Sequence, residues 1–351
     1  MNNKGFALVA TAGVLGLFSL DAAACATCGC SLTSDAATGL SSQAGWRVSL
    51  EYDYIDQDQL RSGTSAVPSS SVAGINNAGG NQEVEHGTIN RYTTLGIGYS
   101  PDADWAFRLL VPYVDRGHTT YGSATNPLTP DQLSGATATG IGDVKFMVNY
   151  QGLLATHTLG LQVGVKLPTG RYGGPNAEDT GTVGRDPVAF STGPNAQASS
   201  PGNLLDTSLN PGTGSTDLIL GAYYFRPVSQ DFDAFASAQF QAAVAHELDQ
   251  TGEDYRPGNQ ENLSFGLRYE ADPHFVPQVQ VNITHRSSDQ GALADLTDTA
   301  GTVAYVSPGF SWAAAPKLQV YGFVQVPMYS NLQGYQLFPR WTASTGVSYS
   351  F

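Results

Sequence analysis

The sequence predicts an all-β protein, a closed antiparallel transmembrane β-barrel of about 12 strands with short turns at one end and long loops at the other. Three observations lead to this prediction. Apolar and polar residues alternate with a period of two from Trp46 onward, which is the period of strands and not of helices. Charged residues make up only 13% of the chain, and glycine accounts for 40 of 351 residues, so helical bundles and coiled coils are excluded. The chain also ends on an aromatic residue, Phe351, that continues the alternation.

The first strand illustrates the pattern. Residues 46–54 place apolar and aromatic side chains on one face, and Arg47, Glu51 and Asp53 on the other. The same alternation defines each later strand in order. The twelve predicted strands are residues 46–54, 95–99, 105–113, 144–150, 159–167, 218–224, 236–244, 263–269, 279–283, 304–312, 318–326 and 341–351.

The connections between these strands alternate in length. Short turns are expected at residues 100–104, 151–157, 226–231, 271–274 and 313–316, and long links at 57–85, 118–138, 169–214, 247–259, 287–300 and 331–337. Six long and five short connections place both termini at the short-turn end, as in bacterial outer-membrane barrels. Closing the barrel gives every strand two neighbours, so no unpaired edge meets lipid.

The polar face of the strands is expected to line a lumen. Its charged members are Arg47, Glu51, Asp53, Arg108, Asp143, Lys145, Lys166 and Arg268. The apolar face ends in Trp and Tyr at the strand tips, as the aromatic girdles of a membrane barrel do. A periplasmic β-sandwich or a lipocalin-like fold is the alternative, and strands of membrane-spanning length favour the barrel.

The N-terminus reads as an export signal. Residues 1–24 combine Lys4, an uncharged run over residues 5–20 and an Ala-rich end, which is the pattern of a secretory signal peptide. Residues 25–45 lack alternation and precede the first strand, so we expect a cysteine-bearing segment that plugs the barrel formed by residues 46–351. Export together with a barrel places the mature chain in the outer membrane of a Gram-negative bacterium.

All three cysteines lie in that segment, as Cys25, Cys28 and Cys30. Their thiolates are close enough in sequence to hold a soft metal ion. A local disulfide in an oxidising compartment and a lipidated Cys25 are the open alternatives. Haem attachment is excluded because its motif is Cys-x-x-Cys-His, and position 29, which follows Cys28, is Gly and not His. No other cofactor is expected.

Charge and motifs limit the remaining functions. The net charge of −14 excludes nucleic acid as a partner, because phosphate binding needs basic surface. A lipid hydrolase using His285 and Ser287 is an alternative, since both lie near one strand end, although no third group orients the histidine. A barrel partner of a periplasmic redox or metal protein, acting through residues 25–30, is another. A sheath around a multihaem protein is disfavoured because twelve strands enclose too narrow a pore.

The last residues complete the expected set of partners. Tyr349 and Phe351 form an alternating aromatic terminus similar to the insertion signal of outer-membrane barrels. We therefore expect the barrel-assembly machinery, outer-membrane lipid, lipopolysaccharide and a small-molecule solute as partners.

Several segments resemble an outer-membrane family of phenol-degradation (MetA-pathway) transporters, which is long-chain fatty-acid transporter-like. They are residues 140–144, 166–170, 210–215, 307–309 and 326–329, read in this order. The resemblance covers about residues 46–351. It implies an outer-membrane channel or transporter for small hydrophobic or aromatic compounds. We expect a porin-like protein that takes up these compounds by passive diffusion, and not an enzyme. It assigns no individual substrate-binding residue.

Overall fold

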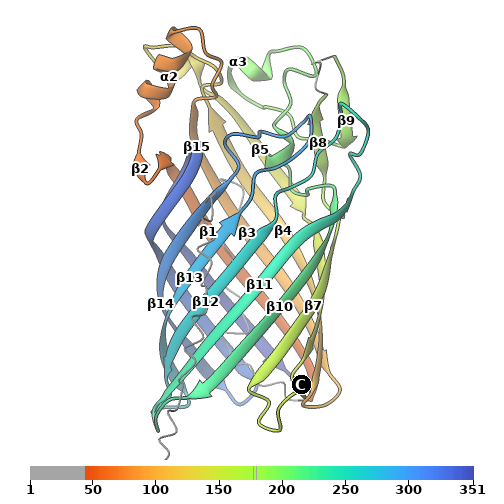
Figure 1. Ribbon diagram of the computed structural model, residues 1–351, viewed down its shortest axis with the longest axis vertical. Helices are drawn as coiled ribbons and strands as arrows, with labels where there is room; N and C mark the ends of the chain where they lie inside the picture. The colour runs from red at the N-terminus through yellow and green to blue at the C-terminus, as the bar shows by residue number, and fades with distance from the viewer. Residues whose placement is uncertain (1–43, 177, 179) are drawn as a thin grey trace, which may run out of the picture.

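The computed structural model describes residues 44–176, 178 and 180–351 of the chain. They form a tall antiparallel barrel of tilted strands (Figure 1). The wall consists of β1 (Gly45–Gly63), β3 (Glu85–Ser100), β4 (Trp105–Thr120), β5 (Ser134–Ile141), β6 (Val144–Tyr150), β7 (Leu159–Leu167), β10 (Ser215–Pro227), β11 (Phe232–His246), β12 (Gln260–Tyr269), β13 (Phe275–Arg286), β14 (Gly301–Ala315) and β15 (Leu318–Ser350). β5 and β6 both pair with β4, so they form one interrupted pass across the wall.

β15 closes the barrel and supplies two passes. Residues 318–332 pair with β14 and residues 332–350 pair with β1, both antiparallel. All neighbouring strands from β14 round to β1 are antiparallel, so β14 and β1 themselves run in opposite directions. β15 can be antiparallel to both only if the chain reverses direction inside β15. Gly334, with φ of 62°, lies at this reversal, where a side chain at Cβ would be strained. The eleven elements of the closed ring therefore make twelve passes, which confirms the predicted strand number.

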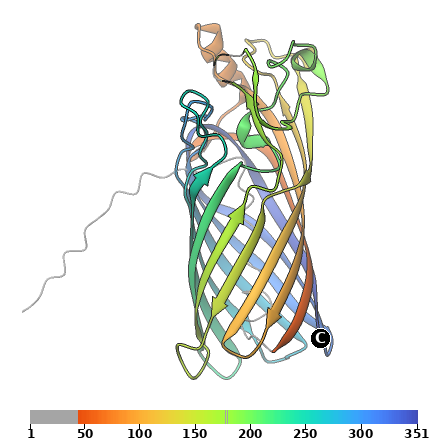
Figure 2. The ribbon, with the colours of Figure 1, turned by 90° about the vertical axis from the view of Figure 1, so that its right-hand side faces the viewer.

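The two chain ends of the barrel meet at the short-turn end. The backbone N–H of Trp46 donates to Phe351 O, and that of Phe351 donates to Trp46 O, both over 2.9 Å. The label C in Figure 1 marks this end, and the long loops crowd the opposite end in both views (Figure 2). In outer-membrane barrels the short turns are periplasmic and the long loops extracellular, and we use these terms for the two ends.

The outer face of the wall carries an apolar band between two aromatic belts. Trp105 and Tyr113 bound it on β4, and Trp341 and Tyr349 bound it on the last pass, all at least 40% exposed. Each pair encloses nine residues, and about 9–11 residues of tilted strand cross the hydrocarbon core. The band of exposed apolar side chains thus matches the thickness of a membrane. A soluble barrel would instead bury such side chains inside.

The strands continue beyond this band on the extracellular side, which corrects several predicted boundaries. β1 runs on to Gly63 and β4 to Thr120, where the sequence predicts the strands to end at residues 54 and 113. β5 occupies part of the predicted link 118–138. Hydrophobic alternation fades there because the outer face meets water rather than lipid, whereas backbone pairing persists.

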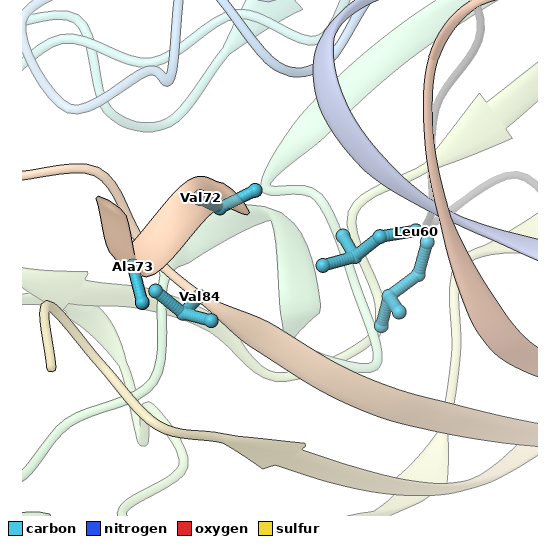
Figure 3. Close-up of a cluster of buried hydrophobic side chains, with 5 residues drawn as sticks. Leu60, Val72, Ala73 and Val84 are labelled. Carbon is cyan, nitrogen blue, oxygen red and sulfur yellow. The ribbon is translucent and has the colours of Figure 1, made fainter. Parts of the chain in front are cut away.

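The extracellular loops carry short elements of their own. They are β2 (Ser65–Ala66), α2 (Ser69–Asn77), η1 (Pro130–Gln132), β8 (Tyr172–Pro175), β9 (Thr182–Arg185), α3 (Gly193–Ala196) and η2 (Thr207–Leu209). Within the described residues, no helix is both long and apolar enough to cross a bilayer. Figure 3 shows how α2 is held: Val72 and Ala73 pack with Leu60 of β1 and with Val84, and all four are buried. This cluster fixes the first long loop over the barrel mouth.

Candidate functional site

Two cavities lie one above the other inside the barrel. The upper one, of about 340 Å³, lies below the long loops and is lined in part by Pro257. The lower one, of about 770 Å³, reaches the short-turn rim, where Phe351 lines it. The two linings share Ser49, Arg108 and Asn149, so the cavities meet at this level.

Seven of the eight charged residues predicted for the polar strand face border these cavities. Glu51, Asp53, Asp143, Lys145 and Lys166 line the upper cavity, Arg47 lines the lower one, and Arg108 lines both. The eighth, Arg268, is also buried but lines neither of the two. Its guanidinium instead forms an ion pair with Glu270, with an Nη2–Oε1 distance of 3.0 Å. Arg268 therefore neutralises a charge at the short-turn end rather than facing either space.

Lys166 is the centre of a buried ion network in the upper cavity. Its Nζ atom lies 2.9 Å from Asp217 Oδ2 and 3.4 Å from Asp143 Oδ2, and the three side chains are at most 6% exposed. The ammonium also donates to the hydroxyls of Thr213 and Ser215. Burial of a charge is tolerated only where opposite charge and hydrogen bonds replace water, and this network supplies both.

Asp143 joins three segments that are far apart in sequence. It accepts hydrogen bonds from the backbone N–H groups of Gly170, over 3.1 Å, and Thr213, over 2.9 Å. A Cβ atom on Gly212 would lie 2.7 Å from Asp143 Oδ1, so only glycine permits this approach. Three of the segments that carry the family resemblance, residues 140–144, 166–170 and 210–215, thus meet at one place.

Arg116 holds the same inward loop from the other side, and the sequence analysis missed it. It is 4% exposed. Its guanidinium donates to Leu209 O over 2.7 Å, to Asn210 O over 3.3 Å, to Asn90 Oδ1 over 2.6 Å and to Tyr92 Oη over 2.9 Å. Arg116 lies past the predicted end of its strand. It is an even number of residues from Arg108, so it faces the lumen as Arg108 does, and this spacing is the sequence signal that could have identified it.

A second loop contributes to the lining of the upper cavity and is held in place by Asp289. This carboxylate is fully buried. It pairs with Arg286 of β13 and accepts hydrogen bonds from Tyr255 Oη and Gly258 N, both over 2.8 Å. Because Tyr255, Gly258 and Arg286 all line the cavity, this contact ties loop 247–259 to the barrel mouth.

Large side chains lie flat against the inner wall where glycines make room for them. A Cβ atom on Gly346 would lie 2.4 Å from Tyr321 Cζ, and one on Gly160 would lie 2.1 Å from Tyr223 Cζ. The Tyr321 hydroxyl, held in this way, donates to Glu51 of β1. The aromatic rings therefore follow the wall instead of crossing the lumen.

An apolar stripe on the inner face of β4 is the second feature that the sequence analysis missed. Leu110, Pro112 and Val114 line the upper cavity, between Arg108 and Arg116 on the same face. The stripe was hidden because the outward residues of this strand are apolar too, so both faces of residues 109–114 look alike in the sequence.

Two carboxyl groups with opposite pKa shifts line a small cavity among the extracellular loops. Glu83 and Asp206 line a cavity of about 220 Å³ together with His118, whose Nε2 atom is 3.9 Å from Glu83 Oε1. Burial, together with the charge and hydrogen bond of Glu83, raises the pKa of Asp206 to about 8. Burial acts upward on the pKa of Glu83 too, but the nearby side chains of His118, Thr120 and Asp206 together outweigh it and lower the pKa of Glu83. At neutral pH the proton is therefore on Asp206.

The residues of the lipid-hydrolase alternative do not form a catalytic pair. His285 Nδ1 is hydrogen-bonded to Thr302 Oγ1 over 2.9 Å, while Ser287 Oγ accepts from the backbone N–H of Asn259 over 2.9 Å. A histidine activates a serine only through a direct hydrogen bond, so this geometry gives the alternative no support.

The metal prediction falls outside what the structure describes. Cys25, Cys28 and Cys30 precede residue 44, where the described part of the chain begins. Among the residues from 44 onward that are described, no three His, Cys, Asp or Glu side chains are placed to hold a metal ion.

Comparison with known proteins relates the chain to outer-membrane barrels. No profile of a known protein family and no curated protein sequence matches it. The COG4313 outer membrane channel from Pseudomonas putida F1 is similar with a TM-score of 0.58 at 12% identity, covering 88% of this chain and 97% of that one. The translocator domain of the autotransporter NalP from Neisseria meningitidis has a TM-score of 0.47 at 9% identity, covering 91% and 92%. The toluene transporter TbuX of Ralstonia pickettii has a TM-score of 0.42 at 10% identity, covering 88% and 90%.

These similarities differ in what they establish. At 12% identity the channel shows the fold alone, and the scores of the other two are too low to carry an argument. The fold, with its apolar outer band, is that of a bacterial outer-membrane β-barrel.

Proposed function

We propose that this chain is a passive channel of the bacterial outer membrane for small hydrophobic or aromatic solutes. One observation carries the proposal: the two lumenal cavities meet at Ser49, Arg108 and Asn149 inside a closed wall whose outer face is apolar. A solute moving between the two ends would pass this level. The channel fold of the Pseudomonas putida protein and the resemblance of the sequence segments support the same function.

The test places a bulky side chain at the level where the cavities meet. Ser49→Trp projects an indole into the lumen, whereas Leu50→Trp, one residue later, points to lipid because Leu50 is 49% exposed on the outer face. In proteoliposome swelling assays with phenylalanine and arabinose, we expect Ser49→Trp to slow swelling severalfold and Leu50→Trp to leave it unchanged. Phenylalanine should enter faster than arabinose. Equal swelling of both variants would contradict a route through the lumen.

Three further expectations join the proposal. The exterior above the apolar band carries an exposed ion pair of Arg340 with Asp58, 3.0 Å apart, of the kind that lipopolysaccharide phosphates and their cations would meet. Tyr349 and Phe351 are 48% and 57% exposed on the outside of the last pass, where an assembly factor can read them. The plug formed by residues 25–45 stays a prediction, because residues 25–43 lie outside the described part of the chain.

A further inference from the structure

Five acidic residues cluster at the extracellular end of the barrel. Glu83 and Asp206 line the small cavity of about 220 Å³ among the loops. Glu85, Asp295 and Asp298 lie close enough to interact electrostatically with this pair or with one another. Within the part of the chain that the structure describes, none of the five forms an ion pair with a lysine or an arginine. The cluster thus lacks a permanent positive charge of its own, which a cation from solution would supply.

A buried histidine directs an unpartnered ring nitrogen toward this pair. His118 lines the cavity and is 1% exposed. Its Nδ1 atom lies 2.8 Å from Thr88 Oγ1, whereas its Nε2 atom has no hydrogen-bond partner among the described residues. Nε2 is 3.9 Å from Glu83 Oε1, which is too long for a hydrogen bond. Buried polar atoms in folded proteins almost always have a partner, so the unpartnered Nε2 marks a place where a ligand atom would fit.

The acceptors suit a nitrogen that carries several hydrogens. With the ring hydrogen on Nδ1, His118 Nε2 is an acceptor, and a donor nitrogen placed about 2.8–3.0 Å from it and from Glu83 Oε1 would bridge the two. Asp206, which is hydrogen-bonded to Glu83, supplies a third acceptor once its proton leaves. A primary ammonium group has three N–H donors and no acceptor, so one such group satisfies all three side chains.

The rest of the lining favours an organic cation over a metal ion. Phe190, Leu204, Leu205 and Leu209 line the same cavity. Leu205 and Leu209 belong to a buried apolar cluster against which Phe190 packs, so this side of the cavity suits an apolar body. In the described part of the chain, no three His, Cys, Asp or Glu side chains are placed to hold a metal ion. The cavity is smaller than the roughly 300–1,000 Å³ of sites for drug-sized ligands, so its ligand is small.

We propose that this cavity binds small primary ammonium compounds with an apolar body, the class of arylalkyl amines, through Glu83, Asp206 and His118. Binding exchanges one positive charge for another: the ammonium enters and the proton of Asp206 leaves to solvent, so the net charge of the site stays the same. The pKa of Asp206, about 8, means that this proton is present at neutral pH. The lining shares no residue with the two lumenal cavities, so the inference does not depend on the proposed channel function.

The test is isothermal titration calorimetry of benzylamine hydrochloride into the purified full chain in detergent at pH 7. We expect saturable binding of one ligand per chain. Its affinity should exceed that of benzyl alcohol, which lacks the charge, and of benzyltrimethylammonium, which lacks the N–H donors, by at least about tenfold. Titrations in buffers that differ in ionisation enthalpy should show a release that approaches one proton per bound ligand.

Variants of the three side chains locate the binding within the cavity. Glu83→Gln should weaken benzylamine binding about tenfold, because a charged acceptor is lost. Asp206→Asn should abolish the proton release. Asp131→Asn is the matched control: it removes an exposed loop carboxylate that lines none of the three cavities, and it should bind benzylamine as the unaltered chain does. Folding is followed by heat-modifiable migration, and His118→Phe replaces Glu83→Gln in the binding measurement if that variant fails to fold.

The outcomes separate this inference from the proposed function. Absence of saturable benzylamine binding, equal affinity for benzyl alcohol, or unchanged affinity of Glu83→Gln overturns the inference. Loss of benzylamine binding in calcium chloride at a concentration below that of benzylamine itself would assign the cavity to an inorganic cation and overturn it as well. The swelling comparison of Ser49→Trp and Leu50→Trp decides the channel function by itself, so a conducting barrel without benzylamine binding refutes only the ammonium site.

Discussion

Removal of the Lys166 ammonium provides a sharp test of the lumenal ion network. Lys166→Met keeps a side chain of similar length and deletes the charge. Asp143 and Asp217, which lie 3.4 and 2.9 Å from Nζ, then remain as buried carboxylates without their shared cation. Breaking a buried ion pair by removing one partner costs about 3–5 kcal/mol. We expect a loss of that size in the free energy of unfolding.

The assay is urea-induced unfolding in lipid vesicles, followed by tryptophan fluorescence. Arg340→Met is the matched control, because its ion pair with Asp58 is 62% and 49% exposed and such pairs contribute less than about 1 kcal/mol. Adding Asp143→Asn and Asp217→Asn to Lys166→Met should recover part of the lost free energy, since no buried charge then remains at the network. Equal losses for Lys166→Met and Arg340→Met would refute the reasoning.

Three other predictions concern the wall and the loops. Gly346→Ala places a Cβ atom 2.4 Å from Tyr321 Cζ, so we expect it to lower the free energy of unfolding by about 1–3 kcal/mol and to reduce swelling rates as the ring moves into the lumen; unchanged values in both assays would contradict the close packing. Val84→Ala should speed proteolysis in the first long loop by loosening α2, while the urea midpoint of the barrel stays the same; a lower midpoint would show that the loop cluster also stabilises the wall. The raised pKa of Asp206 means that its stabilising protonated form is retained at low pH and lost as pH rises through about 8, so the protection factors of loop amides, which correct exchange for its intrinsic dependence on pH, should be lower at pH 9 than at pH 5 in the unaltered chain; Asp206→Asn should flatten this dependence, and equal slopes would count against protonation of Asp206.

The sequence predicted the wall well because strand alternation is a local property. Residues 46–54 and 105–113 each show which side chains face lipid, and the structure places their aromatic ends in two belts. Predictions failed where this signal weakened. The extension of β4 to Thr120 was missed because its outer face there meets water and carries polar residues such as Asp115.

The candidate site was less accessible from the sequence. The sequence placed Asp143, Lys145 and Lys166 on a polar face but did not indicate their partners. The ion pair of Asp143 with Lys166 connects the residue just before β6 with β7. Arg116 and the stripe of Leu110 and Pro112 carry no motif. Their importance arises only when loop 208–213 enters the lumen and completes the lining of the cavity that they face.

What the sequence determined by itself is the period of two, the alternation of short and long connections and the terminal aromatic residue, which together require twelve passes and an apolar exterior. These follow from contacts between each residue and its immediate neighbours or the surrounding medium. The tertiary structure alone decided that β15 reverses at Gly334, that Lys166 neutralises both Asp143 and Asp217, and that Arg116 draws a loop into the barrel. The physical reason is distance along the chain: Asp143 and Thr213 are 70 residues apart, and only the closed barrel brings their atoms within hydrogen-bonding range.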